Sequence, residues 1–230
     1  MKLSDIDTSV YYPITIPSTK KKTKFRPFRV REERALLTAQ ESEDSAVMIN
    51  TLESVVKSCV VGCPELTTFD VEYLFVQVRS KSVGETADIV STCQHCGEKN
   101  HVTLNLTKVE VVGADQDKKI KLADNLIVLM KYPSIGDVAE LVGHGDFASQ
   151  DTKVISAAIE TVYYNDTVFH TKESDTAEIL EFLLNRSDEE MSKLVEFIEN
   201  IPSVILETEY TCKKCSEKNM VSIKNLSDFF

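Results

Sequence analysis

A short sequence block that occurs twice constrains this chain more than any other feature. Residues 93–100 read CQHCGEKN, and residues 212–219 read CKKCSEKN. Each copy is Cys-x-x-Cys followed by a small residue and Glu-Lys-Asn, with alternating strand-like residues on both sides. A Cys-x-x-Cys turn brings two thiolates onto one metal ion, and the small residue lets the turn close. Two such turns supply four sulfurs, the number that a closed tetrahedral structural zinc site requires.

The sequence therefore predicts one structural zinc ion per chain. An iron–sulfur cluster uses the same four ligands and stays open as an alternative, as do two turns without metal. A thioredoxin-like redox pair is disfavoured, because neither motif opens a helix after a strand. Neighbouring lysines are placed to offset the negative charge of four thiolates: Lys99, Lys213, Lys214 and Lys218. The predicted ligands are Cys93, Cys96, Cys212 and Cys215.

The other two of the six cysteines, Cys59 and Cys63, lie beside Val60 and Val61 and are expected in the core. The 230 residues are 42% hydrophobic and 27% charged, which is ordinary globular composition. No apolar run approaches the roughly 18 residues that cross a bilayer, and the N-terminus lacks the apolar segment of a secretion signal. These features predict an intracellular chain that uses cysteine for metal binding or redox chemistry instead of disulfides.

Charge is spread unevenly along the chain. The formal net charge is −11, but residues 1–34 hold nine Lys and Arg against four Asp and Glu, so this segment carries +5 and the remainder −16. The acidic total disfavours nucleic acid as a partner. Aromatic residues and prolines without a helical period predict that residues 1–34 form an extended arm, which either folds back on the acidic body or docks on a partner chain. The predicted docking residues are Tyr11, Tyr12, Phe25, Arg26, Phe28 and Arg29.

Hydrophobic periodicity predicts an α+β fold. Helices are expected at about 32–39, 46–57, from Thr67 or Thr68 to Val83-Gly84, and at 135–147, 151–162, 175–185 and 188–200. Strands are expected in a hairpin over 88–106, at 126–132, in a hairpin over 163–169, and at 204–211 and 220–224. The expected domains are the arm 1–34, helices with the first Cys-x-x-Cys hairpin over 35–112, a mainly helical insertion over 113–202, and a second hairpin over 203–230 that completes a split zinc-ribbon-like subdomain.

Catalytic signatures are missing from the sequence. It contains no P-loop, no dinucleotide-binding glycine motif, no G-x-S-x-G and no H-E-x-x-H. The abundant carboxylates belong to amphipathic helices, where a solvated face is the expected role. Four cysteines around one metal leave no open position for catalysis. The sequence therefore predicts a chain that is not an enzyme.

Two further stretches resemble a known family. Residues 25–37 (FRPFRVREERALL) join an extended segment to a helix, and residues 70–85 (DVEYLFVQVRSKSVGE) form a helix that leads into the first Cys-x-x-Cys hairpin. Together with that hairpin they resemble the baseplate-hub protein family of T4-like contractile-tailed bacteriophages. That family includes a structural central-hub subunit and a related hub-assembly factor. The resemblance covers about residues 24–106, whereas the insertion rests on pattern alone.

The resemblance implies a structural component of the phage tail baseplate hub, acting by protein–protein contacts during tail assembly. Its partners would be other baseplate and hub proteins, and it would reach the virion after assembly in the host cytoplasm. A transient hub-assembly factor absent from the finished particle is the first alternative. A zinc-ribbon nucleic-acid binder is the second, and it predicts affinity that falls steeply with salt.

Overall fold

The fold was analysed in a computed structural model, which describes residues 8–42, 44–113, 116–137 and 150–223. The chain separates into two compact units. The first runs up to Val112 and resumes at Ser203, and the second is Gly113–Pro202. Both helices and antiparallel sheets are present, so the predicted α+β class is confirmed. No helix among the described residues is both long enough and apolar enough to cross a membrane.

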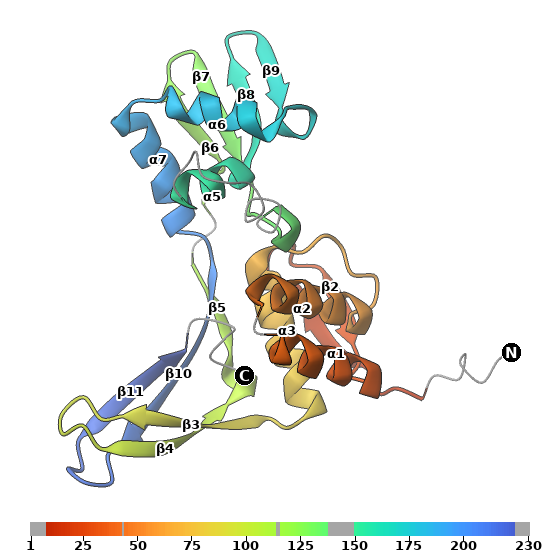
Figure 1. Ribbon diagram of the computed structural model, residues 1–230, viewed down its shortest axis with the longest axis vertical. Coiled ribbons are helices and arrows are strands. Elements are labelled where there is room, and N and C mark those ends of the chain that lie inside the picture. Colours follow the sequence, from red (N-terminus) through yellow and green to blue (C-terminus); the bar gives the residue numbers. More distant parts are fainter. Residues whose placement is uncertain (1–7, 43, 114–115, 138–149, 224–230) are drawn as a thin grey trace, which may run out of the picture. The chain divides into compact units, whose positions relative to one another are not determined.

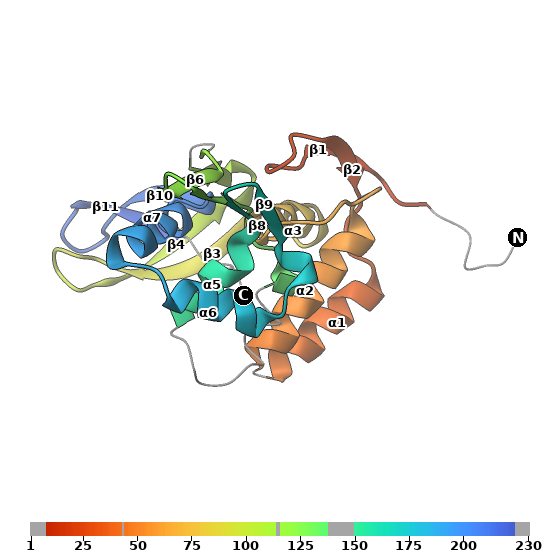
Figure 2. The ribbon, with the colours of Figure 1, turned by 90° about the horizontal axis from the view of Figure 1, so that it is seen from above.

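Three helices form the body of the first unit: α1 (Val30–Glu41), α2 (Ser45–Cys59) and α3 (Thr68–Ser82). They confirm the three helices expected in this region, and α1 and α2 lie side by side (Figure 2). Thr67 caps α3 by accepting a hydrogen bond from the Asp70 backbone N–H, which satisfies one of the unpaired donors of the first turn. Helix α3 is the most buried of the three, because its apolar residues point to more than one neighbour: Phe69, Val71, Leu74, Phe75, Val76 and Val78.

The described part of the N-terminal segment is extended, but it is folded onto the helices. Strand β1 (Tyr12–Thr15) pairs antiparallel with β2 (Lys22–Phe25). Strand β2 is in turn bound to the end of α2. Phe25 forms an antiparallel β-bridge with Val60, and the Arg26 N–H donates to the Cys59 carbonyl at 3.0 Å. Of the two alternatives predicted for the arm, residues 12–26 therefore adopt the one in which the segment folds back on the body of its own chain. Burying its apolar side chains stabilises the unit, which a solvated arm would not do.

Two hairpins carry the cysteine motifs (Figure 1). Strand β3 (Thr86–Thr92) pairs with β4 (Lys99–Asn105), and β10 (Ser203–Thr211) pairs with β11 (Lys218–Ile223). A 3₁₀ turn, η2 (Leu106–Lys108), follows β4. Strand β4 alternates buried and exposed residues, and its buried series runs Asn100, Val102 and Leu104. The predicted hairpin over 88–106 and the predicted strands at 204–211 and 220–224 are confirmed within a few residues.

The second unit begins and ends beside a pair of neighbouring strands. Strand β5 (Glu110–Val112) pairs antiparallel with β10, with Val112 opposite Ser203. Chain exit and return are therefore adjacent, so a long insertion leaves the ribbon undisturbed. Gly113 has φ +126°, and a Cβ atom there would lie 2.8 Å from the Pro202 Cα. Only glycine fits this junction without a shift of the backbone.

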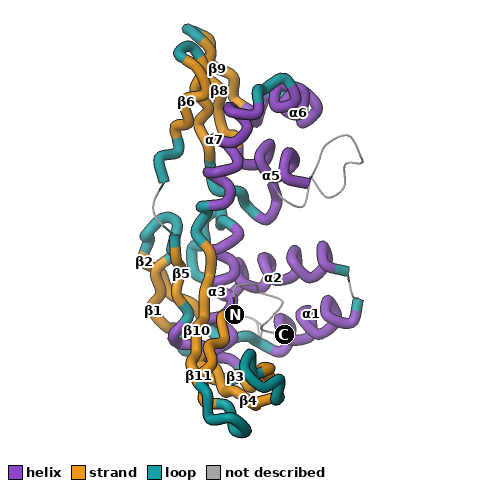
Figure 3. The backbone as a smooth tube through the Cα atoms, turned by 90° about the vertical axis from the view of Figure 1, so that its left-hand side faces the viewer, coloured by secondary structure: helices purple, strands orange, loops and turns teal. Residues whose placement is uncertain are grey.

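In the described part of the second unit, helices accompany a four-stranded antiparallel sheet. The strands are β6 (Lys119–Ala123), β7 (Leu126–Met130), β8 (Ile159–Tyr164) and β9 (Thr167–His170), in that order across the sheet. Helices α5 (Gln150–Ala158), α6 (Thr176–Leu184) and α7 (Asp188–Glu199) lie on one side of it (Figure 3), and a 3₁₀ turn, η3 (Thr171–Glu173), precedes α6.

The sequence predicted much of this unit and erred at identifiable places. The strand at 126–132, the hairpin over 163–169 and the helices at 175–185 and 188–200 are confirmed, and Ser187 and Glu190 form the expected capping box of α7. The helix expected over 151–162 ends at Ala158, because Ile159 begins a strand that pairs with Met130. Of the helix expected over 135–147, residues 135–137 are helical and the rest lies outside the described residues.

Candidate metal centre

Both cysteine motifs fold into the same kind of turn. The Cys93 N–H donates to the Glu98 carbonyl and the Gly97 N–H to the Cys93 carbonyl, each at 2.9 Å. In the second motif Cys212 N–H donates to the Glu217 carbonyl at 2.9 Å and Ser216 N–H to the Cys212 carbonyl at 3.0 Å. The small residue after the second cysteine has a positive φ in both turns: +72° at Gly97 and +61° at Ser216. This is the conformation that closes the turn, and it explains why a small residue follows each motif.

The four predicted ligands come together, two from each hairpin. The Cys93 and Cys215 sulfurs are 3.7 Å apart, the Cys96 and Cys212 sulfurs are 3.6 Å apart, and all four lie within 4.8 Å of one another. None is in a disulfide. Tetrahedral zinc with Zn–S distances of about 2.3 Å holds its sulfurs about 3.8 Å apart. The four thiols therefore have the spacing of ligands around a single metal ion.

Two asparagines brace the turns against each other, and the sequence analysis missed them. The Asn100 Oδ1 accepts from the Lys213 backbone N–H at 2.9 Å, and its Nδ2 lies 3.6 Å from the Cys212 sulfur. In the reciprocal contact the Asn219 Oδ1 accepts from the Gln94 backbone N–H at 3.0 Å. Both asparagines are buried. Each asparagine thus binds the backbone N–H of the residue that follows the first cysteine of the opposite motif, so the two contacts are symmetric. The signal was present in the sequence, because Asn occupies the same place in both copies of the motif.

Charges around the site link the hairpins as well. The Nζ atoms of Lys213 and Lys214 each lie 3.6 Å from a carboxylate oxygen of Glu98. All three side chains retain solvent contact, so these ion pairs contribute little to stability by themselves. They do place two cations of one hairpin over the turn of the other. Lys99 and Lys218, also predicted to offset the thiolate charge, are exposed at the ends of β4 and β11.

The sulfurs have unequal proton affinities. Hydrogen bonds from the backbone N–H groups of Cys215 and Lys214 to the Cys212 sulfur lower the pKa of Cys212 to about 6, and they outweigh desolvation, which raises it. The Glu217 backbone N–H favours the Cys215 thiolate, but desolvation and the three neighbouring sulfurs outweigh it and raise the pKa of Cys215 to about 12. Four thiolates this close repel one another, so a cation is needed to hold them all ionised.

The asparagine bracing leads to a prediction. We expect Asn100→Asp to weaken metal binding about 10-fold to 100-fold, the usual effect of losing an outer hydrogen-bond partner. The aspartate still accepts from Lys213 N–H, but it loses the Nδ2 donor and places a carboxylate beside the Cys212 sulfur. Competition against a coloured chelator measures the affinity.

Asn105→Asp is the matched control, because Asn105 lies on the same strand and uses only its acceptor oxygen, toward Thr107. Equal affinities for the two variants would show that Asn100 does not support the ligands.

The six predicted docking residues have different environments in the structure. Phe25 and Arg26 are buried, with 2% and 4% of their surface exposed, so neither is available to a partner. Arg26 instead pairs with Glu32 at 2.8 Å. Tyr12 is half-buried against Phe25, and Phe28 is half-buried against Phe75. Tyr11 and Arg29 remain at the surface. The prediction is therefore wrong for Phe25 and Arg26, because their side chains complete the core instead of facing solvent.

Comparison with known proteins identifies a family. The profile of a family described as T4 bacteriophage base plate protein matches residues 9–230, which is nearly the whole chain and includes both units and both cysteine motifs. No curated protein and no solved structure gave a match.

Proposed function

The chain belongs to the T4 bacteriophage base plate protein family, and we propose that within the baseplate it is a structural subunit of the hub. Membership makes it a component of the phage baseplate, located in the virion tail with partners among the tail proteins. The finer assignment to the hub is supported by residues 25–37 and 70–85, whose sequence resembles hub proteins. Assembly in the host cytoplasm is part of the same proposal.

The proposal includes one structural zinc ion in the four-cysteine site. Two observations support zinc: the ligand set is four sulfurs, and their 3.6 and 3.7 Å separations suit one tetrahedral ion. An iron–sulfur cluster spreads its cysteines over several metal atoms, which requires a wider arrangement than sulfurs within 4.8 Å. Zinc would hold the β3–β4 and β10–β11 hairpins together, because each contributes two ligands. Its chemistry here would be structural, since four protein ligands leave no open position.

The proposed mode of action is binding without catalysis. In the proposed site the thiolates of Cys93, Cys96, Cys212 and Cys215 all serve as ligands, and Cys59 and Cys63 lie outside the cluster. With Phe25 and Arg26 buried, the N-terminal hairpin supports the helices and offers a smaller surface, including Tyr11 and Arg29, to neighbouring subunits. A rigid, metal-braced body is suited to a permanent place in an assembly, since preorganised surfaces lose less entropy on binding.

Mass spectrometry of purified virions tests the structural role. We expect peptides from this chain in intact, gradient-purified particles, in a fixed ratio to other baseplate subunits. An abundant host protein, followed through the same gradient, measures contamination. If peptides occur in the infected-cell lysate but are missing from the particles, the chain is a transient hub-assembly factor and the structural proposal is wrong.

A further inference from the structure

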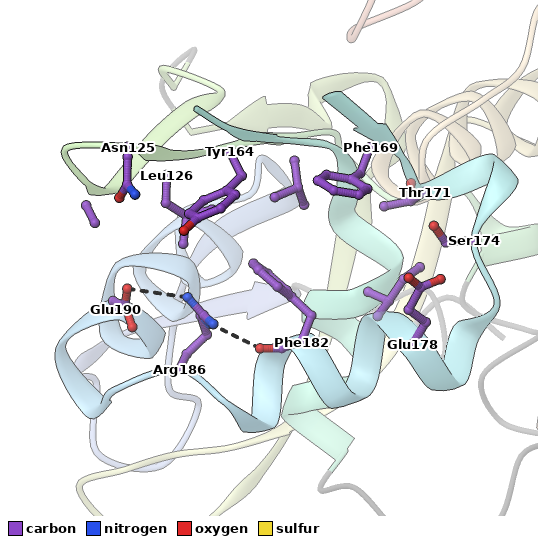
Figure 4. Close-up of a pocket in the computed structure, with 13 residues that line it drawn as sticks. Asn125, Leu126, Tyr164, Phe169, Thr171, Ser174, Glu178, Phe182, Arg186 and Glu190 are labelled. Carbon is purple, nitrogen blue, oxygen red and sulfur yellow. Dashed lines mark hydrogen bonds and ion pairs between the residues drawn. The ribbon is translucent and has the colours of Figure 1, made fainter. Parts of the chain in front are cut away.

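The second unit contains a cavity of about 540 Å³ between its sheet and helix α6. Figure 4 shows its two walls: Leu126, Tyr164 and Phe169 come from the sheet, and Phe182 points toward them from α6. Volumes of this size are typical of ligand sites in proteins. All of its lining residues belong to the second unit, so the site is complete within it.

The sheet wall of this cavity is apolar and incompletely covered. In the strand register Val162 is opposite Phe169 and Leu126 is opposite Tyr164, so these four side chains share one face of the sheet. Helix α6 covers that face only in part, because Tyr164 and Phe169 each keep 47% of their surface exposed. Two aromatic rings that line a cavity and remain half exposed are typical anchors of a binding surface.

Strand β9 borders the cavity and is an edge of the described sheet. Its residues Thr167, Val168, Phe169 and His170 are all exposed, and none of them is a proline or a lysine. Exposed edge strands of this kind accept an additional strand from another chain. The backbone of a strand added beside β9 would pair with the open edge of β9. Every second side chain of the added strand would then lie on the same face of the sheet as Phe169, above the cavity.

Charge indicates what kind of segment fits. Residues 113–202 contain 18 Asp and Glu against eight Lys and Arg, so this unit carries −10 of the chain's −11. Glu178 and Glu190 lie at opposite ends of the cavity (Figure 4). Arg186 also lines it: its guanidinium stacks on the Phe182 ring at 4.6 Å and pairs with Glu190 at 3.7 Å, so these two charges compensate each other and Glu178 gives the lining its net negative charge. The surroundings therefore favour a cationic occupant.

We propose that this groove binds an extended, basic segment of another tail protein, in which apolar side chains alternate with Lys or Arg. The apolar side chains enter the cavity against Phe169 and Phe182, and the cations face the acidic rim. The basic, aromatic segment of a second copy is a poor occupant, because its Phe25 and Arg26 are buried in its own first unit. The proposal rests on the proposed function in one respect, namely that the segment belongs to another tail protein. Binding of such a segment to the groove is tested with the purified chain, without virions.

Selection from random 12-residue peptides displayed on ribosomes, with the full-length chain as bait, tests the chemistry of the groove. We expect enriched peptides to alternate aromatic or aliphatic residues with Lys or Arg. Enrichment of acidic peptides, or no enrichment over an unrelated bait, overturns the proposal. Concentration-dependent self-association that blocks the selected peptide also overturns it, because a second copy would then be the occupant.

Matched variants locate the binding site of a selected peptide. By fluorescence anisotropy we expect Phe169→Ser to weaken binding about tenfold, as loss of an aromatic anchor does. Val168→Ser should leave it unchanged, because Val168 is equally exposed on the same strand but faces the other side of the sheet. Equal effects of these two variants would place the peptide elsewhere.

A charge variant keeps the test independent of folding. Glu178→Gln, at an exposed helix position on the rim, should weaken binding about two- to fivefold at low salt, with the difference vanishing at high salt. Glu181→Gln on the same helix, which does not line the cavity, should have no effect. An unchanged affinity for Glu178→Gln would contradict the acidic-rim argument. Virion mass spectrometry gives its result separately, so failure of the structural proposal is distinguishable from failure of this one.

Discussion

Replacing Cys93 by serine is expected to abolish stoichiometric metal binding and to unfold the two hairpins. Each hairpin contributes two of four ligands, so loss of one sulfur opens the site and releases the link between them. Metal binding and folding are coupled in such sites, where structural zinc contributes on the order of 10 kcal/mol in isolated peptides. We expect a destabilisation of at least about 4–5 kcal/mol, which for a chain of this size lowers the unfolding midpoint by roughly 10–20 °C.

Elemental analysis and calorimetry of protein prepared without chelator measure both effects. The unmodified chain should hold about one zinc ion, the expectation for four sulfurs around a single metal. Cys63→Ser is the matched control, because Cys63 is a free, half-buried cysteine outside the cluster, so its loss should leave the stoichiometry unchanged. Stoichiometric iron in the unmodified chain would refute zinc. A Cys93→Ser protein with full metal content and an unchanged midpoint would refute the site itself.

The sequence was most informative where a local pattern repeats. Two turns with the same residues at the same offsets predicted which cysteines come together, although 115 residues separate Cys96 from Cys212. The capping residues Thr67 and Ser187 likewise marked where helices begin, because capping depends on residues within one turn. Contacts across the repeat were missed: Asn100 and Asn219 act on the opposite hairpin, and that pairing exists only once the hairpins have assembled.

The N-terminal segment shows why the remainder could not be predicted. Its aromatic and basic composition is equally compatible with a docking arm and with a hairpin that closes a core. The structure shows the hairpin, because Phe25 forms a β-bridge with Val60 and Arg26 forms an ion pair with Glu32. These contacts join chain positions up to 35 residues apart. The groove in the second unit was missed for the same reason. Phe169 was expected on a hairpin and Phe182 on a helix, but no local sequence pattern indicates that these two elements face each other across a cavity.

The buried Arg26–Glu32 pair carries the second large expected effect. Both side chains are 4% exposed and 2.8 Å apart, and Arg26 also donates to the Ser58 carbonyl at 3.1 Å. Removing one partner leaves the other charge buried without compensation, which costs about 3–5 kcal/mol. We therefore expect Glu32→Ala to lower the unfolding midpoint by roughly 10–20 °C. Glu33→Ala, at the exposed neighbouring position of α1, should change it little.

The same pair predicts how stability depends on pH. Burial alone would raise the pKa of Glu32, but hydrogen bonds from Arg26, Arg31 and the Arg29 backbone outweigh it and lower the pKa to about 2. A carboxylate whose folded-state pKa is depressed stabilises the fold above its unfolded value of 4.5, and this contribution is lost as the pH falls from about 4.5 to 2. A shift from 4.5 to about 2 corresponds to about 3 kcal/mol.

Peptide-resolved hydrogen exchange on α1 and α2 measures this in the first unit without interference from the second. Protection in the unmodified chain should fall between pH 4.5 and 2 more steeply than in Glu32→Gln, which keeps the side-chain shape but cannot titrate. A double variant, Arg26→Met with Glu32→Leu, should recover much of the stability lost in Glu32→Ala, because apolar side chains of similar volume replace a buried pair at little cost. Identical pH profiles for the unmodified chain and Glu32→Gln would show that this carboxylate does not hold the N-terminal hairpin to the helices.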